Sequence, residues 1–298
     1  MNPVLKGNLL LLTAAFFWGT TFVAQRVGMQ DIGPLAFSGI RFTMGTVMLV
    51  PFLFWHRTRT GPVHKGSFSN RKAFWGICIA GVVLCLGINL QQFGLVYTTA
   101  ANAAFITGLY VVIVPFMGML LKQYPGWGGV LGASIAVAGL YLLSMTRGLS
   151  LSFGDGLVLF GAFVWAAHVL VIGWLSPRMN SYVLAAGQFA VVALLSLVGA
   201  LLFEQTTMEG VVAAGLPLVY GGVLSVGTGF TLQVVAQRHS PPTHAAVIMS
   251  LEAVFGAVGG WIILNELLSG RQAVGCLLML AGMLITQLWP TRSIVQAG

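Results

Sequence analysis

Long apolar stretches separated by short polar segments occupy most of this sequence. Each stretch is about 20 residues long, which is the length an α-helix needs to cross a bilayer core. A helix is also expected because a spanning segment must satisfy its own backbone hydrogen bonds. The first stretch is too long for a signal peptide and should remain as a helix. The pattern predicts ten transmembrane helices, at 8–28, 35–54, 73–93, 101–121, 127–146, 155–175, 182–203, 214–236, 243–263 and 272–290.

The placement of basic residues predicts an orientation, because cytoplasmic loops carry more Lys and Arg than external ones. With a cytoplasmic N-terminus, ten basic residues fall on the inner side: Lys6, Arg57, Arg59, Lys65, Arg71, Lys72, Lys122, Arg178, Arg238 and Arg292. Only Arg26, Arg147 and Arg271 then lie near the outer face. We therefore expect both termini in the cytoplasm.

The two halves of the chain resemble each other. The segment GNLLLLTAAFFW (7–18) aligns with GDGLVLFGAFVW (154–165) at a shift of 147 residues, which also places Arg41 on Gln188. Later matches keep the same order. A shift of 142 pairs Gly87 with Gly229, Gln91 with Gln233 and Ala103 with Ala245, and a shift of 143 pairs Gly132 with Gly275 and Gly139 with Gly282. This order indicates two repeats, 1–146 and 147–298.

Five crossings per repeat is an odd number, so the second copy enters the membrane from the opposite side. The predicted fold class is an all-α membrane protein of ten helices, a 5+5 inverted-topology repeat with a pseudo-two-fold axis in the membrane plane. Because substrate sites of such folds lie at the repeat interface, we expect a central cavity there. Repeats that exchange conformations would provide alternating access.

Composition agrees with a lipid environment. Hydrophobic residues make up 57% of the chain and charged residues 7%, whereas soluble domains average about 25% charged. The net charge of +8 comes mainly from the loops, so it indicates topology rather than nucleic-acid binding. Cys78, Cys85 and Cys276 lie in apolar runs and match no metal or disulfide pattern. We expect no metal, no cofactor and no catalytic set.

The closing segment SLEAVFGAVGGWIILNELLSGRQAVGCLLMLAGMLITQ (250–287) and the opening segments FFWGTTFVAQRVG (16–28) and GIRF (39–42) carry a family resemblance. They are similar to EamA-type members of the drug/metabolite transporter superfamily. Two departures occur: Ala253 replaces the usual Pro after Leu-Glu, and Asn265-Glu266 stands where Gly-Glu is common. The first half has no counterpart of Glu266.

This resemblance covers nearly the whole chain. It implies ten helices around a central cavity, transport without ATP hydrolysis and a place in a bacterial inner membrane. Characterised relatives include exporters of amino acids and other metabolites, and exchangers of nucleotide sugars or triose phosphates. The expected partners are a small-molecule substrate and membrane lipid, but no nucleic acid, and the protein is expected to be a monomer or a homodimer.

Two full charges, Arg41 and Glu252, are predicted to lie deep in the bilayer, where a charge needs a partner or water. One interpretation makes Glu252 a proton-coupling carboxylate and Arg41 a group that binds a substrate carboxylate. The other is a structural ion pair, or separate hydrogen bonds to neighbouring helices. Because both residues lie in segments that follow the family pattern, a shared architectural or gating role is favoured.

Uncharged polar and aromatic side chains at similar depth are candidates to line the cavity. They are Trp18, Thr21, Asn89, Gln91, Gln92, Trp165, His168, Ser225, Thr228 and Gln233. The two tryptophans are repeat-related, and helical spacing puts Ser225 and Thr228 on one stripe. The alternatives are rigid packing for the tryptophans and hydrogen bonds between helices for His168 and the other polar residues.

Small residues indicate close helix contacts. Such residues are Gly256 and Gly260 on the ninth predicted helix, and Gly132, Gly139, Gly275 and Gly282 on the fifth and tenth. The fifth and tenth helices carry few polar atoms, so we expect them to face lipid, each other or a second subunit. Acidic residues near helix ends are expected to be solvated or to lie at helix N-termini: Asp31, Asp155, Glu204, Glu209 and Glu266.

These features predict a secondary transporter or facilitator that moves small amphipathic metabolites, above all amino acids, outward by alternating access. An exporter of organic cations is the nearest alternative, although it would usually need more acidic groups in the cavity than Glu252. A membrane enzyme that modifies lipids would need clustered carboxylates or histidines at one membrane face. A channel would not need repeats that exchange shapes. The chain contains no P-loop, HExxH or CxxC motif.

Overall fold

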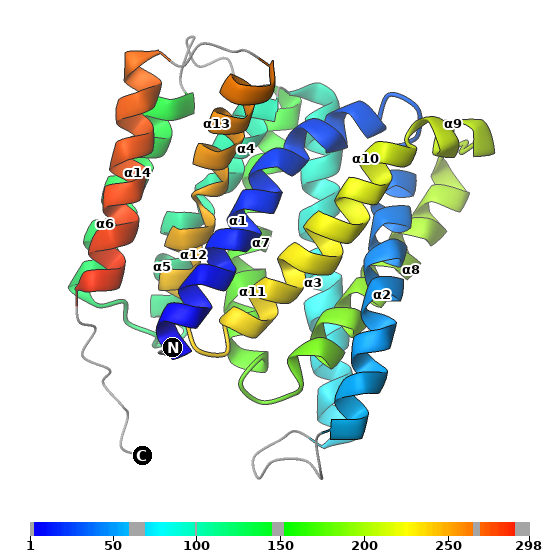
Figure 1. The fold of residues 1–298 in the computed structure, drawn as a ribbon, viewed down its shortest axis with the longest axis horizontal. Coiled ribbons are helices and arrows are strands. Elements are labelled where there is room, and N and C mark those ends of the chain that lie inside the picture. Colours follow the sequence, from blue (N-terminus) through cyan, green and yellow to red (C-terminus); the bar gives the residue numbers. More distant parts are fainter. Residues whose placement is uncertain (1–2, 60–68, 99, 145–151, 265–268, 290–298) are drawn as a thin grey trace.

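The computed structural model describes residues 3–59, 69–98, 100–144, 152–264 and 269–289. Within these ranges every regular element is a helix, and the helices pack side by side as a bundle (Figure 1). The boundary predicted between the two repeats lies outside the described residues. So do several residues used for the orientation and the family comparison: Lys65, Arg147, Asn265, Glu266 and Arg292.

Among the described residues, seven helices are long and apolar enough to cross a membrane. They are α1 (Pro3–Gly28), α2 (Pro34–Arg59), α3 (Asn70–Tyr97), the pair α4 (Ala100–Gly108) and α5 (Tyr110–Leu120), α7 (Phe153–Leu175), α8 (Ser181–Phe203), and the series α10 (Gly215–Val219), η1 (Tyr220–Phe230) and α11 (Thr231–Ala236). Shorter apolar helices follow the remaining predicted spans: α6 (Trp127–Ser144), the pair α12 (Pro242–Met249) and α13 (Glu252–Leu264), and α14 (Gly270–Leu288). A short helix, α9 (Met208–Ala213), precedes α10. The prediction of an all-helical, multi-pass membrane protein is confirmed.

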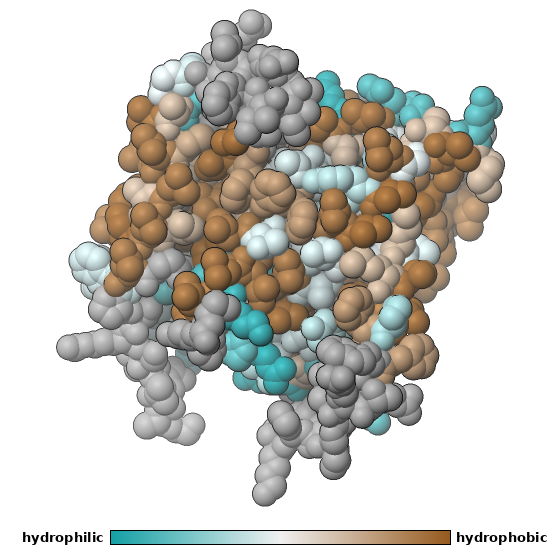
Figure 2. Space-filling model, in the orientation of Figure 1, coloured by the Kyte–Doolittle hydropathy of each residue, from teal (hydrophilic) through white to brown (hydrophobic). Residues whose placement is uncertain are grey.

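Apolar side chains also cover the outside of the bundle. Phe54, Leu120 and Phe203 are among many large hydrophobic residues that are exposed. Figure 2 shows hydrophobic residues across the middle of one face, with hydrophilic residues gathered toward its upper and lower ends. Apolar patches of this extent are not found on soluble monomers, so the middle of the bundle fits the hydrocarbon core of a bilayer.

Two of the predicted spans are interrupted near their middle. The span predicted at 101–121 changes at Leu109 from α4 to α5, and the one at 243–263 changes at Ser250 and Leu251 from α12 to α13. At the shift of 142 residues, Tyr110, the first residue of α5, corresponds to Glu252, the first residue of α13. The two interruptions therefore occur at matching positions, and at both the backbone stays in the helical region, with φ −61° and ψ −15° at Leu109 and at Ser250.

The contacts between helices follow the same correspondence. The helix α2 packs on α8, and α6 packs on α14; each of these pairs is related by the repeat shift. The helix α3 packs on α7, and correspondingly the series α10–η1–α11 packs on α1. Likewise, α5 meets α12 and α4 meets α13. Exchanging the helices for their counterparts leaves these contacts unchanged, whereas some smaller ones, such as that of α4 with α6, have no counterpart of similar size among the described residues.

Glycines bring the backbones of α6 and α14 into contact. A Cβ on Gly139 would lie 2.6 Å from the carbonyl oxygen of Gly275 and 2.8 Å from the nitrogen of Met279. Symmetrically, a Cβ on Gly282 would lie 2.6 Å from the carbonyl oxygen of Gly132. Lipid, each other and a second subunit were the three surroundings predicted for these helices. The structure shows that their glycine faces pack against each other.

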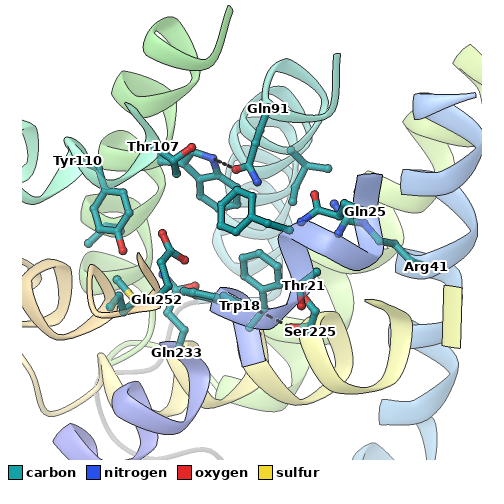
Figure 3. Close-up of a pocket in the computed structure, with 16 residues that line it drawn as sticks. Trp18, Thr21, Gln25, Arg41, Gln91, Thr107, Tyr110, Ser225, Gln233 and Glu252 are labelled. Atoms are coloured by element: carbon teal, nitrogen blue, oxygen red, sulfur yellow. Dashed lines mark hydrogen bonds between the residues drawn. The ribbon is translucent and has the colours of Figure 1, made fainter. Parts of the chain in front are cut away.

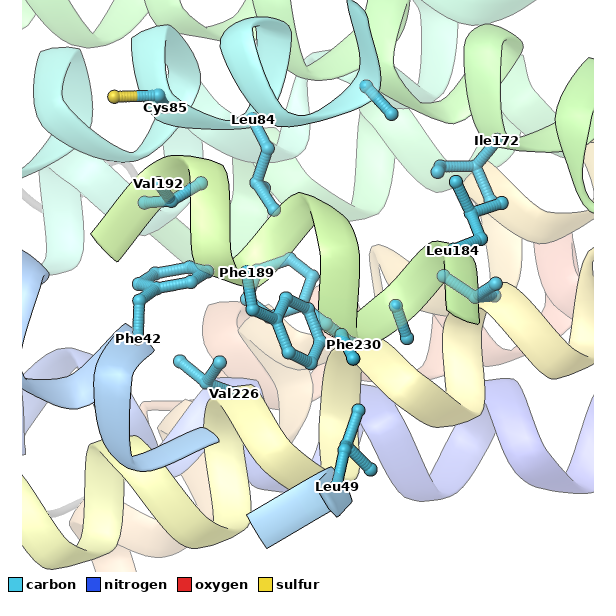
Figure 4. Close-up of a cluster of buried hydrophobic side chains, with 14 of the residues drawn as sticks. Phe42, Leu49, Leu84, Cys85, Ile172, Leu184, Phe189, Val192, Val226 and Phe230 are labelled. Carbon is cyan, nitrogen blue, oxygen red and sulfur yellow. The ribbon is translucent and has the colours of Figure 1, made fainter. Parts of the chain in front are cut away.

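An apolar cluster joins α2, α3, α8 and η1 beside the centre of the bundle (Figure 4). Three aromatic rings, those of Phe42, Phe189 and Phe230, lie within 5.8–6.2 Å of one another, measured between ring centroids. All three side chains are buried. Phe230 also forms part of the wall of the cavity described next, so the cluster fixes one side of that cavity.

Candidate functional site

A cavity lies inside the bundle, between α1, α3, α7, η1, α11 and the two interrupted helices (Figure 3). It is lined by Trp18, Thr21, Phe22, Gln25, Arg41, Ile88, Gln91, Thr107, Tyr110, Trp165, Val169, Ser225, Phe230, Gln233, Met249 and Glu252. Its free volume is about 40 Å³, enough for a few water molecules at about 10–15 Å³ each. A metabolite would fit only if the walls moved apart.

Most of the lining residues form repeat-related pairs. These pairs are Trp18 with Trp165, Phe22 with Val169, Ile88 with Phe230, Gln91 with Gln233, Thr107 with Met249, and Tyr110 with Glu252. The cavity therefore draws on both halves of the chain at corresponding positions. Its two sides are not chemically equal, because the position occupied by a phenol in the first half carries a carboxylate in the second.

Three aromatic residues form one wall. The ring of Phe230 lies 4.7 Å from that of Trp18 and is stacked at 5.8 Å on that of Trp165, with 8° between the planes. The indole N–H of Trp18 donates to the Ser225 carbonyl oxygen at 3.3 Å, and that of Trp165 donates to Gln91 Oε1 at 3.0 Å. Because both donors are satisfied, the indole rings are held in place beside the cavity.

The two buried charges lie on opposite sides of the cavity, as Figure 3 shows. The Arg41 guanidinium donates to Gln92 Oε1 at 3.4 Å and lies 5.4 and 5.5 Å from the rings of Phe37 and Phe42. Its Nε has no hydrogen-bond partner, and neither has Oε1 of Glu252. Within the described ranges, Arg41 and Glu252 do not form the ion pair that was one of the two interpretations.

Several lining residues were not anticipated from the sequence. They are Phe22, Gln25, Ile88, Thr107, Tyr110, Val169, Phe230 and Met249. Three of them carry a buried oxygen atom without a hydrogen-bond partner: Gln25, Thr107 and Tyr110. One signal for Tyr110 was present, because the repeat shift that relates Gln91 to Gln233 also relates Tyr110 to Glu252.

Eight predicted residues line the cavity, and four do not. The eight are Trp18, Thr21, Arg41, Gln91, Trp165, Ser225, Gln233 and Glu252. Of the others, His168 Nε2 lies 2.9 Å from Gln188 Oε1, and Asn89 donates to the Ser196 hydroxyl at 3.0 Å. Gln92 accepts from Arg41. These three side chains hydrogen-bond to neighbouring helices, which was the alternative interpretation for His168.

Thr228 lies outside the cavity because of an irregular helix. Residues of η1 form a π-helix, in which hydrogen bonds run from i to i+5. Thr228 Oγ1 accordingly donates to the carbonyl oxygen of Val223, five residues earlier, at 3.0 Å. In this geometry residues three apart no longer share a face, so the single stripe predicted for Ser225 and Thr228 is wrong. Segments of π-helix occur frequently at functional sites.

Repeat-related junctions close the bundle at its two opposite ends. At one end Thr98 Oγ1 donates to the buried carboxylate of Asp155 at 2.5 Å. At the other, which carries the N-terminus in Figure 1, Ser240 Oγ donates to Asn8 Oδ1 at only 3.5 Å. The shifts of 142 and 147 relate Thr98 to Ser240 and Asp155 to Asn8. One of two equivalent junctions is therefore closed more tightly than the other.

Two acidic residues have structural partners: Asp155 lies at a helix N-terminus as predicted, whereas Glu204, which was expected to be solvated, also caps a helix. Asp155 is buried and caps α7, where its carboxylate accepts from the backbone nitrogen of Ser152 at 2.8 Å. Glu204 is half-buried and caps α2, accepting from the backbone nitrogens of Leu35 and Ala36 at 2.8 Å each. Negative charge is favourable at a helix N-terminus, which explains both placements.

Comparisons with known proteins agree with this architecture. The EamA-like transporter family matches residues 5–145 and again residues 152–288. An uncharacterized transporter of Archaeoglobus fulgidus is 32% identical, over 95% of this chain and 86% of the relative. The uncharacterized transporter YoaV of Bacillus subtilis is 26% identical, over 94% and 96%. The uncharacterized inner membrane transporter YedA of Escherichia coli is 23% identical, over 74% and 73%.

A solved crystal structure matches with a TM-score of 0.77 and 19% sequence identity, covering 95% of this chain and 96% of that chain. At this identity the match establishes a shared fold. The family match covers nearly the whole chain and occurs once in each half, in agreement with the resemblance of the opening and closing segments. The chain belongs to the EamA-like transporter family.

Proposed function

We propose that this protein is a secondary transporter or facilitator that moves small amphipathic metabolites, above all amino acids, outward across the inner membrane by alternating access. The observation that carries the proposal is the buried cavity, walled by repeat-related residues and holding unpaired polar atoms at membrane depth. Polar groups are costly there unless they meet water or a ligand. A passing solute would supply the missing partners.

The proposed architecture is ten helices in two inverted repeats of five. Three observations support it: the family matches each half separately, the most extensive helix contacts have counterparts in the other half, and two spans are interrupted at corresponding positions. In this arrangement the end of the bundle that carries Asn8 and Ser240 faces the cytoplasm, as the distribution of basic residues indicates.

Alternating access is supported by the unequal closure of the two ends. A Cβ on Gly154 would lie 2.6 Å from the carbonyl oxygen of Gly94, whereas at the opposite end a Cβ on Gly7 would lie 3.3 Å from that of Ala236. The hydrogen bonds at the two junctions differ in the same sense, 2.5 against 3.5 Å. If the two halves exchanged their conformations, the tighter end would loosen and the looser end would close.

The positions of the charged and aromatic side chains support a zwitterionic solute. Arg41 and Glu252 lie on opposite sides of the cavity, and an aromatic wall lies beside them. A zwitterion with an apolar side chain would bring a carboxylate, an ammonium and a hydrophobic surface to these three features. A purely cationic solute would leave the buried Arg41 without a counter-charge, which makes organic cations the second choice.

Counterflow in liposomes tests the proposal. The purified protein is reconstituted with an excess of unlabelled solute inside, and uptake of the same radiolabelled solute is followed. The panel contains amino acids, sugars, phosphorylated sugars and organic cations. We expect saturable, transient accumulation of at least one amino acid and none in protein-free liposomes. Movement of organic cations alone would favour the second choice, and absence of counterflow for the whole panel would refute the transport proposal.

A further inference from the structure

Hydrogen-bond acceptors without partners gather on the Glu252 side of the cavity. The atoms are Oε1 of Glu252, Oε1 of Gln233 and the hydroxyl oxygen of Tyr110, all of them buried and all lining the same cavity. Tyr110 lies within electrostatic range of Glu252, and Figure 3 shows its hydroxyl turned toward that carboxylate. A buried acceptor left unpaired costs about 1–3 kcal/mol, so these atoms favour a ligand that donates hydrogen bonds to them.

The orientation of the Gln233 amide is determined by its neighbours. The carbonyl oxygen of Val169 can only accept, so Gln237 must present its Nε2 there, at 2.9 Å. Gln237 Oε1 then accepts from Gln233 Nε2 at 3.0 Å. Gln233 is left with its oxygen free. The network thus supplies an acceptor, rather than a donor, on the side of the cavity where Glu252 lies.

Glu252 and Tyr110 occupy corresponding positions at the interruptions of two helices. Each is the first residue of the second part of its span, α13 and α5 respectively. Both residues line the cavity, and the helices that carry them contact each other, α5 meeting α12 and α4 meeting α13. Among the described residues that line the cavity, Glu252 is the one acidic side chain, and Arg41, the one basic side chain, lies across from it.

A ligand for this place must carry positive charge and several hydrogen-bond donors. A proton on Glu252 would bring one hydrogen-bond donor to this group of acceptors and would leave no charge there. An ammonium group has three donors and one positive charge. The donors match the three unpaired acceptors, and the charge matches the carboxylate of Glu252, which supplies one of them. The faces of Trp18, Trp165 and Phe230 also favour an organic cation over a strongly hydrated metal ion.

We propose that the cavity binds a primary ammonium group of its solute between Glu252, Tyr110 and Gln233. This inference rests on the proposed transport function and names the chemical group by which the solute is recognised. The opposite side of the cavity, with Arg41, then faces the rest of the solute. Recognition would be asymmetric although the walls are repeat-related, because only the second half places a carboxylate at this position.

Melting temperatures of the purified full chain with a matched set of probes test the proposal, since binding to the folded state raises the melting temperature. The probes are L-leucine, 3-methylbutylamine, which lacks the carboxylate, 4-methylpentanoate, which lacks the amine, and N-acetyl-L-leucine, in which the amine is blocked. We expect L-leucine and 3-methylbutylamine to stabilise the protein, and the other two to have no effect at the same concentration. Equal shifts with all four probes would refute ammonium recognition.

Two variants connect the effect to the site. Glu252→Gln preserves the shape of the side chain, and we expect it to weaken the apparent affinity for 3-methylbutylamine by about tenfold or more, because a charged hydrogen bond is lost. Tyr110→Phe should weaken it by a smaller factor. Glu209→Gln and Tyr124→Phe, at exposed positions away from the cavity, are the matched controls and should change it less than about twofold. The melting temperatures without ligand show whether each variant folds.

The outcomes separate this proposal from the transport proposal. If no probe of the set binds while phosphorylated sugars show counterflow, the ammonium site is refuted and transport stands. If the amines bind but no solute of the panel shows counterflow, the site stands and transport is refuted. A stabilisation by NaCl, but not KCl, that disappears in Glu252→Gln, without any effect of the amines, would assign the carboxylate to an inorganic cation and overturn the proposal.

Discussion

Replacement of Thr98 by Val should weaken the tighter of the two end junctions. Thr98 Oγ1 donates to the Asp155 carboxylate at 2.5 Å, and valine keeps the shape of threonine but has no donor. The carboxylate would keep its bonds to Ser152, at 2.8 Å to the backbone nitrogen and 2.9 Å to the hydroxyl, so α7 would remain capped. The substitution therefore removes one link between α3 and α7 without dismantling either helix.

The size of the effect follows from the charge on the acceptor. A hydrogen bond to a charged group contributes about 1.5–3 kcal/mol. If the protein alternates as proposed, this bond forms only when its end of the bundle is closed, and its loss should shift the equilibrium toward the opposite conformation by about 10- to 100-fold. At the other junction the bond from Ser240 to Asn8 is 3.5 Å long and joins neutral groups. Ser240→Ala should therefore shift the equilibrium by only about fivefold or less.

A single cysteine in the cavity reports this equilibrium. Ser225→Cys is introduced after the native cysteines have been replaced by alanine, and a membrane-impermeant maleimide is added to the side of the membrane where Thr98 lies. We expect Thr98→Val to raise the labelling rate by about tenfold or more. The Ser240→Ala variant serves as the matched control and should slightly raise labelling from the other side. An unchanged rate in Thr98→Val, in a protein of unchanged melting temperature, would refute the assignment of this junction as a gate.

Three further substitutions test individual contacts. Gly139→Ala places a Cβ 2.6 Å from the Gly275 carbonyl oxygen and should lower the unfolding free energy by about 1–3 kcal/mol, whereas Gly156→Ala, which meets nothing within 4 Å, should not; equal stability in detergent unfolding would contradict the α6–α14 contact. Glu204→Gln weakens the cap of α2 and should cost about 1–2 kcal/mol, with Glu209→Gln as the control that leaves the melting temperature unchanged. His168→Leu removes a bond to Gln188 and should lower stability but not the affinity for a transported solute; a specific loss of affinity would place His168 in the binding site.

The helices themselves could be predicted because the bilayer imposes a strong constraint on sequence. An apolar run of about 20 residues has few alternatives to a spanning helix. The bounds of α7, predicted as 155–175 and observed as Phe153–Leu175, illustrate the agreement. Contact between α6 and α14 was one of three surroundings compatible with their glycine faces, and only the packing of the whole bundle selects among them.

The interruptions at Leu109 and at Ser250 could not be predicted from local sequence. Neither position carries a proline, and the residues around them favour helix as much as those of any other span. Both interruptions lie where α4–α5 crosses α12–α13, so tertiary contacts between the halves decide them. The π-helix at Tyr220–Phe230 has a weak signal in its glycines, but the hydrogen-bond shift that turns Thr228 away from Ser225 depends on packing against α1 and α2.

The candidate site could be predicted where repeat symmetry and depth agreed. The two tryptophans were found because they are identical, mid-membrane and related by the shift. Asn89 and His168 lie at similar depth but turn toward Ser196 and Gln188, and a single sequence does not reveal which neighbour a helix face meets. Tyr110 was not predicted because a tyrosine in an apolar run is common and indicates no site by itself. Its position becomes informative only when it is compared with its repeat counterpart, Glu252.

Distances across the two ends of the bundle test the central claim most directly. Spin labels are placed on the exposed residues Tyr97 and Phe153 at one end, and on their repeat counterparts His239 and Lys6 at the other. Because the rings of Tyr97 and Phe153 are only 5.6 Å apart, continuous-wave spectra report the short separations and pulsed measurements the long ones, for each pair in the reconstituted protein. We expect the two distances to change in opposite directions. When a transported solute or the Thr98→Val substitution lengthens the distance between positions 97 and 153, the distance between positions 239 and 6 should shorten. If both pairs keep one unchanged distance, or lengthen together, the two halves do not exchange conformations and alternating access is contradicted.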